Sequence, residues 1–364
     1  MTDRAQHSER IAAIQLLRGL AAVAVAVSHL AYGFADHIGD GLGLPPDRGR
    51  AAQVAVCVFF VISGHVMVVS SRRLEGRREA ARRFWTRRCV RILPTWWIAS
   101  LFTVAVLAWL GRAVDPVPFA LSLFLVPHAA EGFAGRPVFL LWPGWTLFYE
   151  MVFYLLFGLS LAVGRARSPL SRRAVVAGGL IALGLVGEAV EPQGPFLVSL
   201  TRPVLLLFLA GVAIAEMREA GRALAPGMRW ICAALAAATV ALVPAPETVD
   251  ALGFDYLAWA GLPAVFACLA AFGGPLRLPF FPLIDRFGDT SFALYLLHVP
   301  VAHVWIEAFP LRFGPWPFLL SAIGAALGVS LAFFLLVERP LTRRLNAAFG
   351  HAAKGDRMLE RTSV

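Results

Sequence analysis

Residues 11–31 read IAAIQLLRGLAAVAVAVSHLA, an apolar stretch long enough to cross a bilayer as one helix of about 20 residues. Two ionisable side chains, Arg18 and His29, interrupt it. The run is too long for the apolar core of a cleavable signal peptide, so we expect it to be the first of several membrane spans. The rest of the chain agrees, because 59% of its 364 residues are apolar, 15% are charged and the mean hydropathy is +0.70.

Further apolar runs of similar length predict an all-α, polytopic integral membrane protein with about ten transmembrane helices. The expected spans are 11–31, 51–70, 92–110, 144–163, 174–190, 197–215, 230–243, 256–272, 288–309 and 318–337. Several are short or interrupted by Pro or Gly, so the number could differ by one or two. We expect residues 1–345 to form a single membrane domain, and residues 346–364 a disordered, basic cytoplasmic tail.

Basic residues give the chain a net charge of +10, and they cluster at the ends of the apolar runs. The run RRLEGRREAARRFWTRRCVR (72–91) is typical of a membrane-flanking anchor, which argues against nucleic-acid binding. The positive-inside rule then predicts that both termini are cytoplasmic in a bacterial-type inner membrane. Few arginines are expected outside, namely Arg48, Arg50, Arg112, Arg136, Arg202 and Arg312. The four cysteines are scattered, and no metal site or disulfide framework is indicated.

Arg18 and His29 lie eleven residues apart, and eleven steps of about 100° return a helix to within roughly 20° of its starting direction. Both side chains therefore share one face, roughly 16 Å apart along the axis. Charged groups at membrane depth usually serve a function, because each costs about 2.5–3.5 kcal/mol on insertion scales. A structural alternative is equally open, in which Arg18 reaches the inner headgroups and His29 caps the outer end.

Two more charged positions stand out. Arg88 and Arg91, spaced i, i+3 near the expected start of the third span, could bind phosphates, although arginines are common at this interface. Glu150 enters the apolar helix of 144–163 one or two turns from the outer side, at a depth expected to be similar to that of His29. A lone carboxylate in so apolar a helix favours a functional role.

Ser291, Tyr295 and His298 occupy positions i, i+4 and i+7 of the ninth expected span, so they form one helical stripe. Such residues could support a site, or could hydrogen-bond between helices as structural contacts.

A series of blocks, in this order, resembles the membrane acyltransferase-3 family. They are IQLLRGLAAVAVAVSHL (14–30), VFFVISGHVM (58–67), RRCVRILPTWW (87–97), WTLFYEMVFYLLFG (145–158), FGDTSFALYLLH (287–298) and VERPL (337–341). The opening, FVISG and WTLFYE blocks are most similar to exopolysaccharide O-acetyltransferases of the succinoglycan-modifying type. Residues in the fifth to eighth expected spans carry no block of the family.

The resemblance implies roles for individual residues. Arg18 and His29 match the family's essential pair, Arg88 and Arg91 its Arg-x-x-Arg, and Glu150 its acidic residue. Ser63 and Gly64 match its Ser-Gly pair. His65 departs from the pattern, where Phe is usual, and could alter the donor channel or merely pack.

The resemblance and the expected topology together predict a membrane O-acyltransferase. Acetyl-CoA or another acyl-CoA is the expected donor substrate, with no bound cofactor, and its phosphates would meet Arg88, Arg91 and Arg18. His29 would act as general base on a hydroxyl of a glycan or lipid-linked glycan, with Glu150 orienting its ring or stabilising its charged form. An acyl-histidine relay is an alternative mechanism.

Two other classes remain open from the sequence, a multi-pass transporter and a non-enzymatic polysaccharide export subunit. A transporter often shows repetition between its halves, and none is visible. A non-enzymatic subunit would tolerate replacement of Arg18 and His29.

Overall fold

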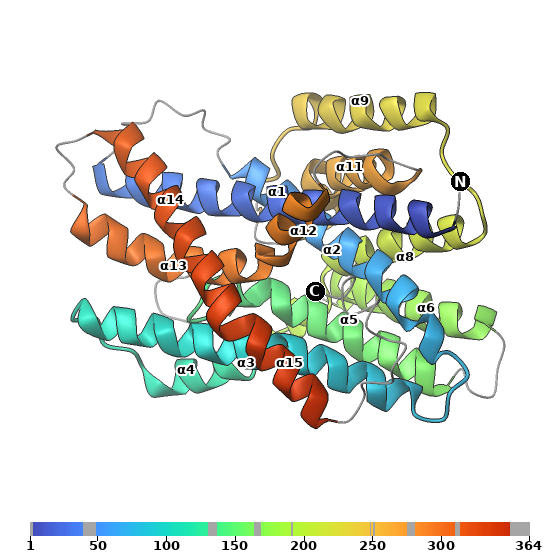
Figure 1. The fold of residues 1–364 in the computed structure, drawn as a ribbon, viewed down its shortest axis with the longest axis horizontal. Helices are drawn as coiled ribbons and strands as arrows, with labels where there is room; N and C mark the ends of the chain where they lie inside the picture. The colour runs from blue at the N-terminus through green and yellow to red at the C-terminus, as the bar shows by residue number, and fades with distance from the viewer. Residues whose placement is uncertain are drawn as a thin grey trace.

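A computed structural model describes residues 3–38, 49–129, 137–163, 169–190, 192–247, 249, 252–274, 281–309 and 314–349. These residues are almost entirely helical (Figure 1). The helices are α1 (Asp3–Ile38), α2 (Arg50–Ser71), α3 (Ala80–Trp109), α4 (Pro116–Leu123), α5 (Gly144–Val163), α6 (Pro169–Val190), α7 (Pro195–Leu200), α8 (Leu206–Glu219), α9 (Pro226–Leu242), α10 (Phe254–Tyr256), α11 (Leu262–Phe272), α12 (Phe281–Asp289), α13 (Ser291–Ala308), α14 (Pro315–Phe333) and α15 (Arg339–Ala348). The strands β1 (His128–Ala129) and β2 (Pro137–Val138) form a two-stranded antiparallel sheet.

Nine helical segments of the described chain are long and apolar enough to cross a membrane, which confirms the all-α polytopic prediction. They correspond to nine of the ten expected spans. The expected span 230–243 coincides with α9, a shorter apolar helix at Pro226–Leu242. Of the expected tail, residues 346–348 end α15, and residues 350–364 lie outside the described part of the chain.

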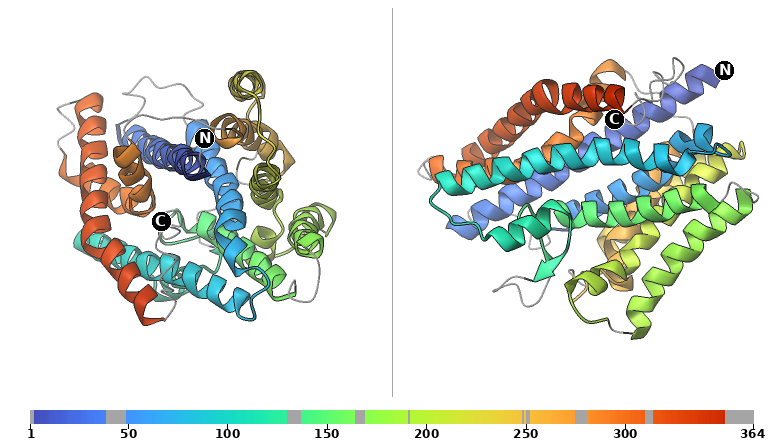
Figure 2. Two further views of the ribbon diagram at one scale, coloured as in Figure 1. Left: turned by 45° about the vertical axis from the view of Figure 1, so that its right-hand side comes forward. Right: turned by 90° about the horizontal axis from the view of Figure 1, so that it is seen from below.

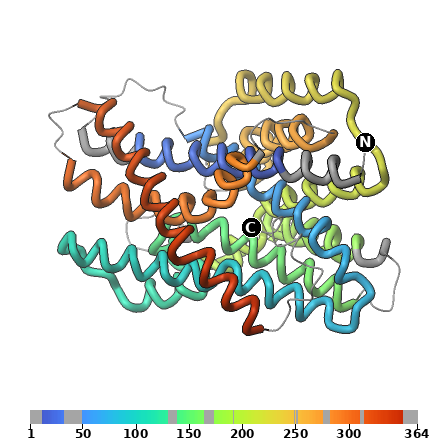
Figure 3. The backbone as a smooth tube through the Cα atoms, viewed as in Figure 1, coloured from blue at the N-terminus to red at the C-terminus, as the bar shows by residue number. Residues whose placement is uncertain are grey.

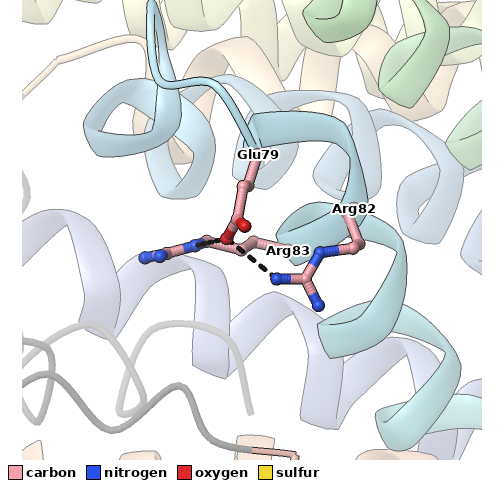
Figure 4. Close-up of polar contacts among 3 residues, drawn as sticks. All are labelled: Glu79, Arg82 and Arg83. Carbon is pink, nitrogen blue, oxygen red and sulfur yellow. Dashed lines mark hydrogen bonds and ion pairs between the residues drawn. The ribbon is translucent and has the colours of Figure 1, made fainter.

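The third span begins earlier than expected, because α3 already starts at Ala80 and continues through Pro94. Arg88 and Arg91 therefore lie well inside a 30-residue helix rather than at its start. At the beginning of α3, the exposed carboxylate of Glu79 pairs with Arg82 at 2.8 Å and with Arg83 at 3.2 Å (Figure 4). Hydrogen bonds from these two arginines lower the pKa of Glu79. Part of the basic run is thus neutralised locally.

The helices pack around α1, which contacts α2, α12, α13 and α14. The tube in Figure 3 shows α1 running beside α13, and the left view of Figure 2 shows α1, α2, α3 and α5 arranged around a common centre. The start of α1 and the turn between α2 and α3 lie at the right of Figure 1, whereas the connection from α3 to α4 lies at the left. The chain therefore alternates between two ends of the bundle.

Arg50 was expected in an outer loop, but it begins α2 and is buried. Its guanidinium donates to the carbonyl oxygens of Thr239, Val240 and Val243 at 2.6–2.9 Å and to that of Trp259 at 2.9 Å. The last carbonyls of a helix lack partners within the helix, so one arginine from α2 satisfies the end of α9. This contact ties the short helix α9 to the bundle.

Two glycines allow α2 and α8 to approach closely. A Cβ on Gly64 would overlap the carbonyl oxygen of Phe208, and one on Gly211 would overlap that of Val61. Small residues at helix crossings let backbones meet inside a membrane. The packing of α2 against α8 therefore requires the glycine of the Ser-Gly pair. This packing also sets the position of the neighbouring Ser63.

We expect Gly64→Ala to separate α2 from α8 and to cost about 1–3 kcal/mol of stability, as overpacking usually does. Gly328→Ala on α14 is the matched control, because its Cβ would meet nothing within 4 Å. Thermal unfolding of the purified proteins in detergent measures the difference. Equal melting temperatures for Gly64→Ala and the wild type would contradict the close contact.

Candidate functional site

A cavity of about 100 Å³ lies between α1, α2, α3, α5 and α13. Its walls combine aromatic and aliphatic side chains, such as Phe59, Phe60 and Phe292, with a dense set of polar groups. The polar groups are Arg18, Ser63, Arg91, Thr146, Glu150, Tyr154, Ser291 and Tyr295. Five helices, four from the first half of the chain and α13 from near its end, therefore bring charged and hydroxyl groups together inside an apolar bundle.

Glu150 is the carboxylate of this cavity, and two hydroxyl groups hold it. Ser63 on α2 donates to Oε1 at 3.0 Å, and Tyr154, one turn further along α5, donates to the same oxygen. Hydrogen bonds of this kind stabilise a carboxylate that has left water. Ser63 and Glu150 were both singled out by the sequence, and the structure brings them into direct contact.

Arg18 enters the cavity from α1 and is only 9% exposed. It donates to Gln15 Oε1 at 3.1 Å, and the amide nitrogen of Gln15 donates to Asp289 at 2.7 Å. Arg91 lines the same cavity from α3, and Glu150 lies within electrostatic range of Arg18. The cavity thus holds two cations and one carboxylate.

Arg88 does not line this cavity. Its guanidinium donates to Ser70 at 2.8 Å and lies 5.7 Å from the ring centres of Phe84 and Tyr154. Such cation–π contacts stabilise a buried guanidinium. The expected pair is therefore divided. Arg91 lines the cavity, whereas Arg88 lies outside it and contacts the ring of Tyr154.

The polar stripe of α13 runs along one side of the cavity and continues past it. Ser291 and Tyr295 line the cavity, and the hydroxyl of Tyr295 lies 2.8 Å from that of Thr146 on α5. His298, 6.2 Å from the ring of Tyr295 between ring centres, lies beyond the cavity lining and is fully buried.

His29 contacts His298 rather than Glu150. The distance from His29 Nδ1 to His298 Nε2 is 2.8 Å, and the rings stack with their centres 5.0 Å apart. Ala22 and Ala26, which lie between Arg18 and His29 on the same face of α1, pack against Leu294 and let α13 approach. Among the described residues, the hydrogen bonds of Glu150 go to Ser63 and Tyr154, so the expectation that Glu150 orients His29 does not match this geometry.

His65 packs away from the cavity. It is fully buried, and its ring centre lies 4.7 Å from that of Phe272 on α11. Of its two expected roles, the placement fits packing.

Sequence reasoning missed Thr146 and Tyr154. Both lie four residues from Glu150, on the same helical stripe, and this spacing could have identified them. Glu338 of the VERPL block is buried within electrostatic range of Arg18 and Arg91, a relation across the chain that no local spacing reveals.

The chain belongs to the acyltransferase-3 family, whose profile, described as an acyltransferase domain, matches residues 11–335. It is 34% identical over 304 residues to the exopolysaccharide production protein ExoZ of Rhizobium meliloti (strain 1021), covering 79% of this chain and 89% of that protein. No solved structure matches the chain. The protein is thus a multi-pass membrane acyltransferase.

We expect Tyr154→Phe to lower acyl transfer by about 10-fold or more, because a hydrogen bond to a charged group contributes about 1.5–3 kcal/mol. The phenyl ring still lies against Arg88. Tyr149→Phe is the matched control on the same helix, since Tyr149 is buried outside the cavity lining. Turnover of the purified proteins measures the effect, and an unchanged rate for Tyr154→Phe would argue against a role of the Glu150 carboxylate.

Proposed function

We propose that this protein transfers an acetyl group, or another short acyl group, from acyl-CoA to a hydroxyl of an exopolysaccharide or other cell-surface sugar. The observation that carries the proposal is the charged cavity of Arg18, Arg91 and Glu150 within an acyltransferase domain. The similarity to a protein named for exopolysaccharide production supports the class of acceptor.

The donor would enter beside the two cavity arginines. Guanidinium groups bind phosphate oxygens through paired hydrogen bonds, so Arg18 and Arg91 suit the anionic part of acyl-CoA. The cavity of about 100 Å³ is far smaller than a whole acyl-CoA. The cavity would therefore hold only the anionic end of the donor, and the pantetheine arm would carry the thioester from it towards His29.

The acceptor would meet His29. Its ring is partly exposed, whereas the ring of His298 is fully buried. A neutral imidazole can take the proton of a sugar hydroxyl as the oxygen attacks the thioester, a contribution of about 10²–10⁴-fold in rate. Glu150 and its two hydroxyl partners would then serve the donor side, at the cavity.

The proposed orientation places both termini and the basic run 72–91 in the cytoplasm, where acyl-CoA is made. Arg18 then lies towards the donor, and His29 lies roughly 16 Å further towards the outer face. The acceptor would be a glycan or lipid-linked glycan at the outer side of the inner membrane.

We expect cells that lack this protein to lose the mass of one acyl group from their modified surface sugars. Cells that carry His29→Ala should show the same loss at normal protein levels, because the base is absent. Mass spectrometry of isolated glycans, with blotting of the membrane fraction, measures both. Unaltered acylation in the deletion strain would refute the proposed acceptor class, and unaltered acylation with His29→Ala would refute the base.

We expect Arg91→Lys to raise the KM for acyl-CoA by about 10-fold, because lysine keeps the charge but loses the planar fork. Arg88→Lys is its matched neighbour and should lower thermal stability with little change in KM, because Arg88 contacts Ser70 and two rings instead. Steady-state kinetics with purified protein separates them. The reverse pattern would place the donor phosphates at Arg88.

A further inference from the structure

His29 and His298 come from helices α1 and α13, 269 residues apart in the sequence, and meet through ring nitrogens 2.8 Å apart. In a hydrogen bond between two imidazoles, one nitrogen donates and the other accepts. Which nitrogen of His29 carries its proton therefore depends on the protonation of His298.

A backbone carbonyl determines that protonation. His298 Nδ1 lies 2.9 Å from the carbonyl oxygen of Leu294, one turn earlier in α13. A carbonyl oxygen only accepts hydrogen bonds, so Nδ1 of His298 carries the proton. The ring is fully buried, and its hydrogen-bond partners among the described residues are the backbones of Leu294 and Tyr295 and the ring of His29, none of them a carboxylate. An imidazolium there would be costly, so His298 is neutral and its Nε2 accepts.

We infer that His298 is a positioning residue that fixes the tautomer of His29, with the proton on Nδ1 and the lone pair on Nε2, where the acceptor hydroxyl loses its proton. This inference rests on the proposed function. His29 donates through Nδ1 to His298, and its other ring nitrogen is left as the base. A hydrogen bond at one ring nitrogen commonly leaves the other as the reactive nitrogen of a histidine in this way.

The proton balance of the transfer follows. Nε2 of His29 takes the hydroxyl proton as the sugar oxygen bonds to the thioester carbonyl carbon. The bond from that carbon to sulfur then breaks, its electron pair stays on sulfur, and Nε2 returns the proton to the leaving thiolate. His29 still donates from Nδ1 to His298 throughout, so the ring keeps its orientation while its charge changes.

His298 differs from the carboxylate that usually orients a catalytic histidine, because it is uncharged. A carboxylate would strengthen His29 as a base and stabilise its imidazolium. A neutral acceptor fixes direction without placing a second charge in an apolar bundle, where unpaired charge is expensive.

Three variants separate this role from simple packing. His298→Gln can place an amide oxygen near the position of Nε2, whereas His298→Phe fills the same space without an acceptor. Fixing of the tautomer predicts that His298→Gln keeps activity within about 10-fold, and that His298→Phe loses about 100-fold in kcat with an unchanged KM for acyl-CoA. If His298 only fills space, His298→Phe should keep more activity than His298→Gln. His303→Phe, further along α13 and outside the site, should leave the rate unaltered.

The tautomer itself is the second measurement, and it is made on the wild-type protein. Nitrogen-15 NMR of the histidine-labelled protein, with His29→Ala for assignment, should show a protonated Nδ1 and an unprotonated Nε2 at His29. The opposite tautomer, or wild-type kcat for His298→Phe, would overturn the inference. If His29→Ala is inactive while His298→Phe is fully active, this inference alone fails. If His29→Ala remains active, the proposed base fails.

Discussion

An ionised side chain is tolerated inside a membrane protein only where other groups replace the hydrogen bonds of water. Glu150 shows how this protein meets that constraint. Its carboxylate accepts from Ser63 on α2 and from Tyr154 on its own helix, and lies within electrostatic range of Arg18 on α1. A charge left without these partners would cost several kcal/mol, so the helices around the cavity must keep their places relative to it. Gly64 contributes to this arrangement, because it lets α2 pack closely against α8 and so positions its neighbour Ser63 to donate to Glu150.

The spans follow from the sequence because apolar length alone decides whether a helix can cross a bilayer. The boundaries are less certain, and α3 shows why. Hydropathy places its start near residue 92, whereas the helix begins at Ala80, because arginine favours helices and its long side chain can reach polar surroundings. Arg50 is the opposite case. Charge counting places it in a loop, but its buried guanidinium donates to carbonyl groups at the end of α9. These carbonyl groups lie about 190 residues away in the sequence.

Helical spacing predicts which residues share a face, but not which neighbour that face meets. Arg18 and His29 share their face as expected, and so do Ser291, Tyr295 and His298. Arg88 and Arg91 differ in direction by about 60° on the helix, enough for one to meet the cavity and the other to meet Ser70. The pairing of His29 with His298 joins two faces that were each visible in the sequence. Their contact depends on the packing of α1 against α13, which no local pattern specifies.

The two faces together also suggest how transfer and hydrolysis are kept apart. Along α1, Ala22 and Ala26 separate the cavity residue Arg18 from His29, and on α13 the cavity ends at Tyr295, one turn before His298. In the proposed reaction, the donor phosphates lie at Arg18 and Arg91 and the base lies beyond the cavity, so the pantetheine arm must span this interval to bring the thioester to His29. The aromatic walls of the cavity limit water on the donor side, whereas the ring of His29 is partly exposed. Water could therefore compete with the acceptor only from the exposed side of this ring, and an acceptor sugar that covers the ring would exclude it. The spacing along the two helices thus decides where the thioester meets its nucleophile.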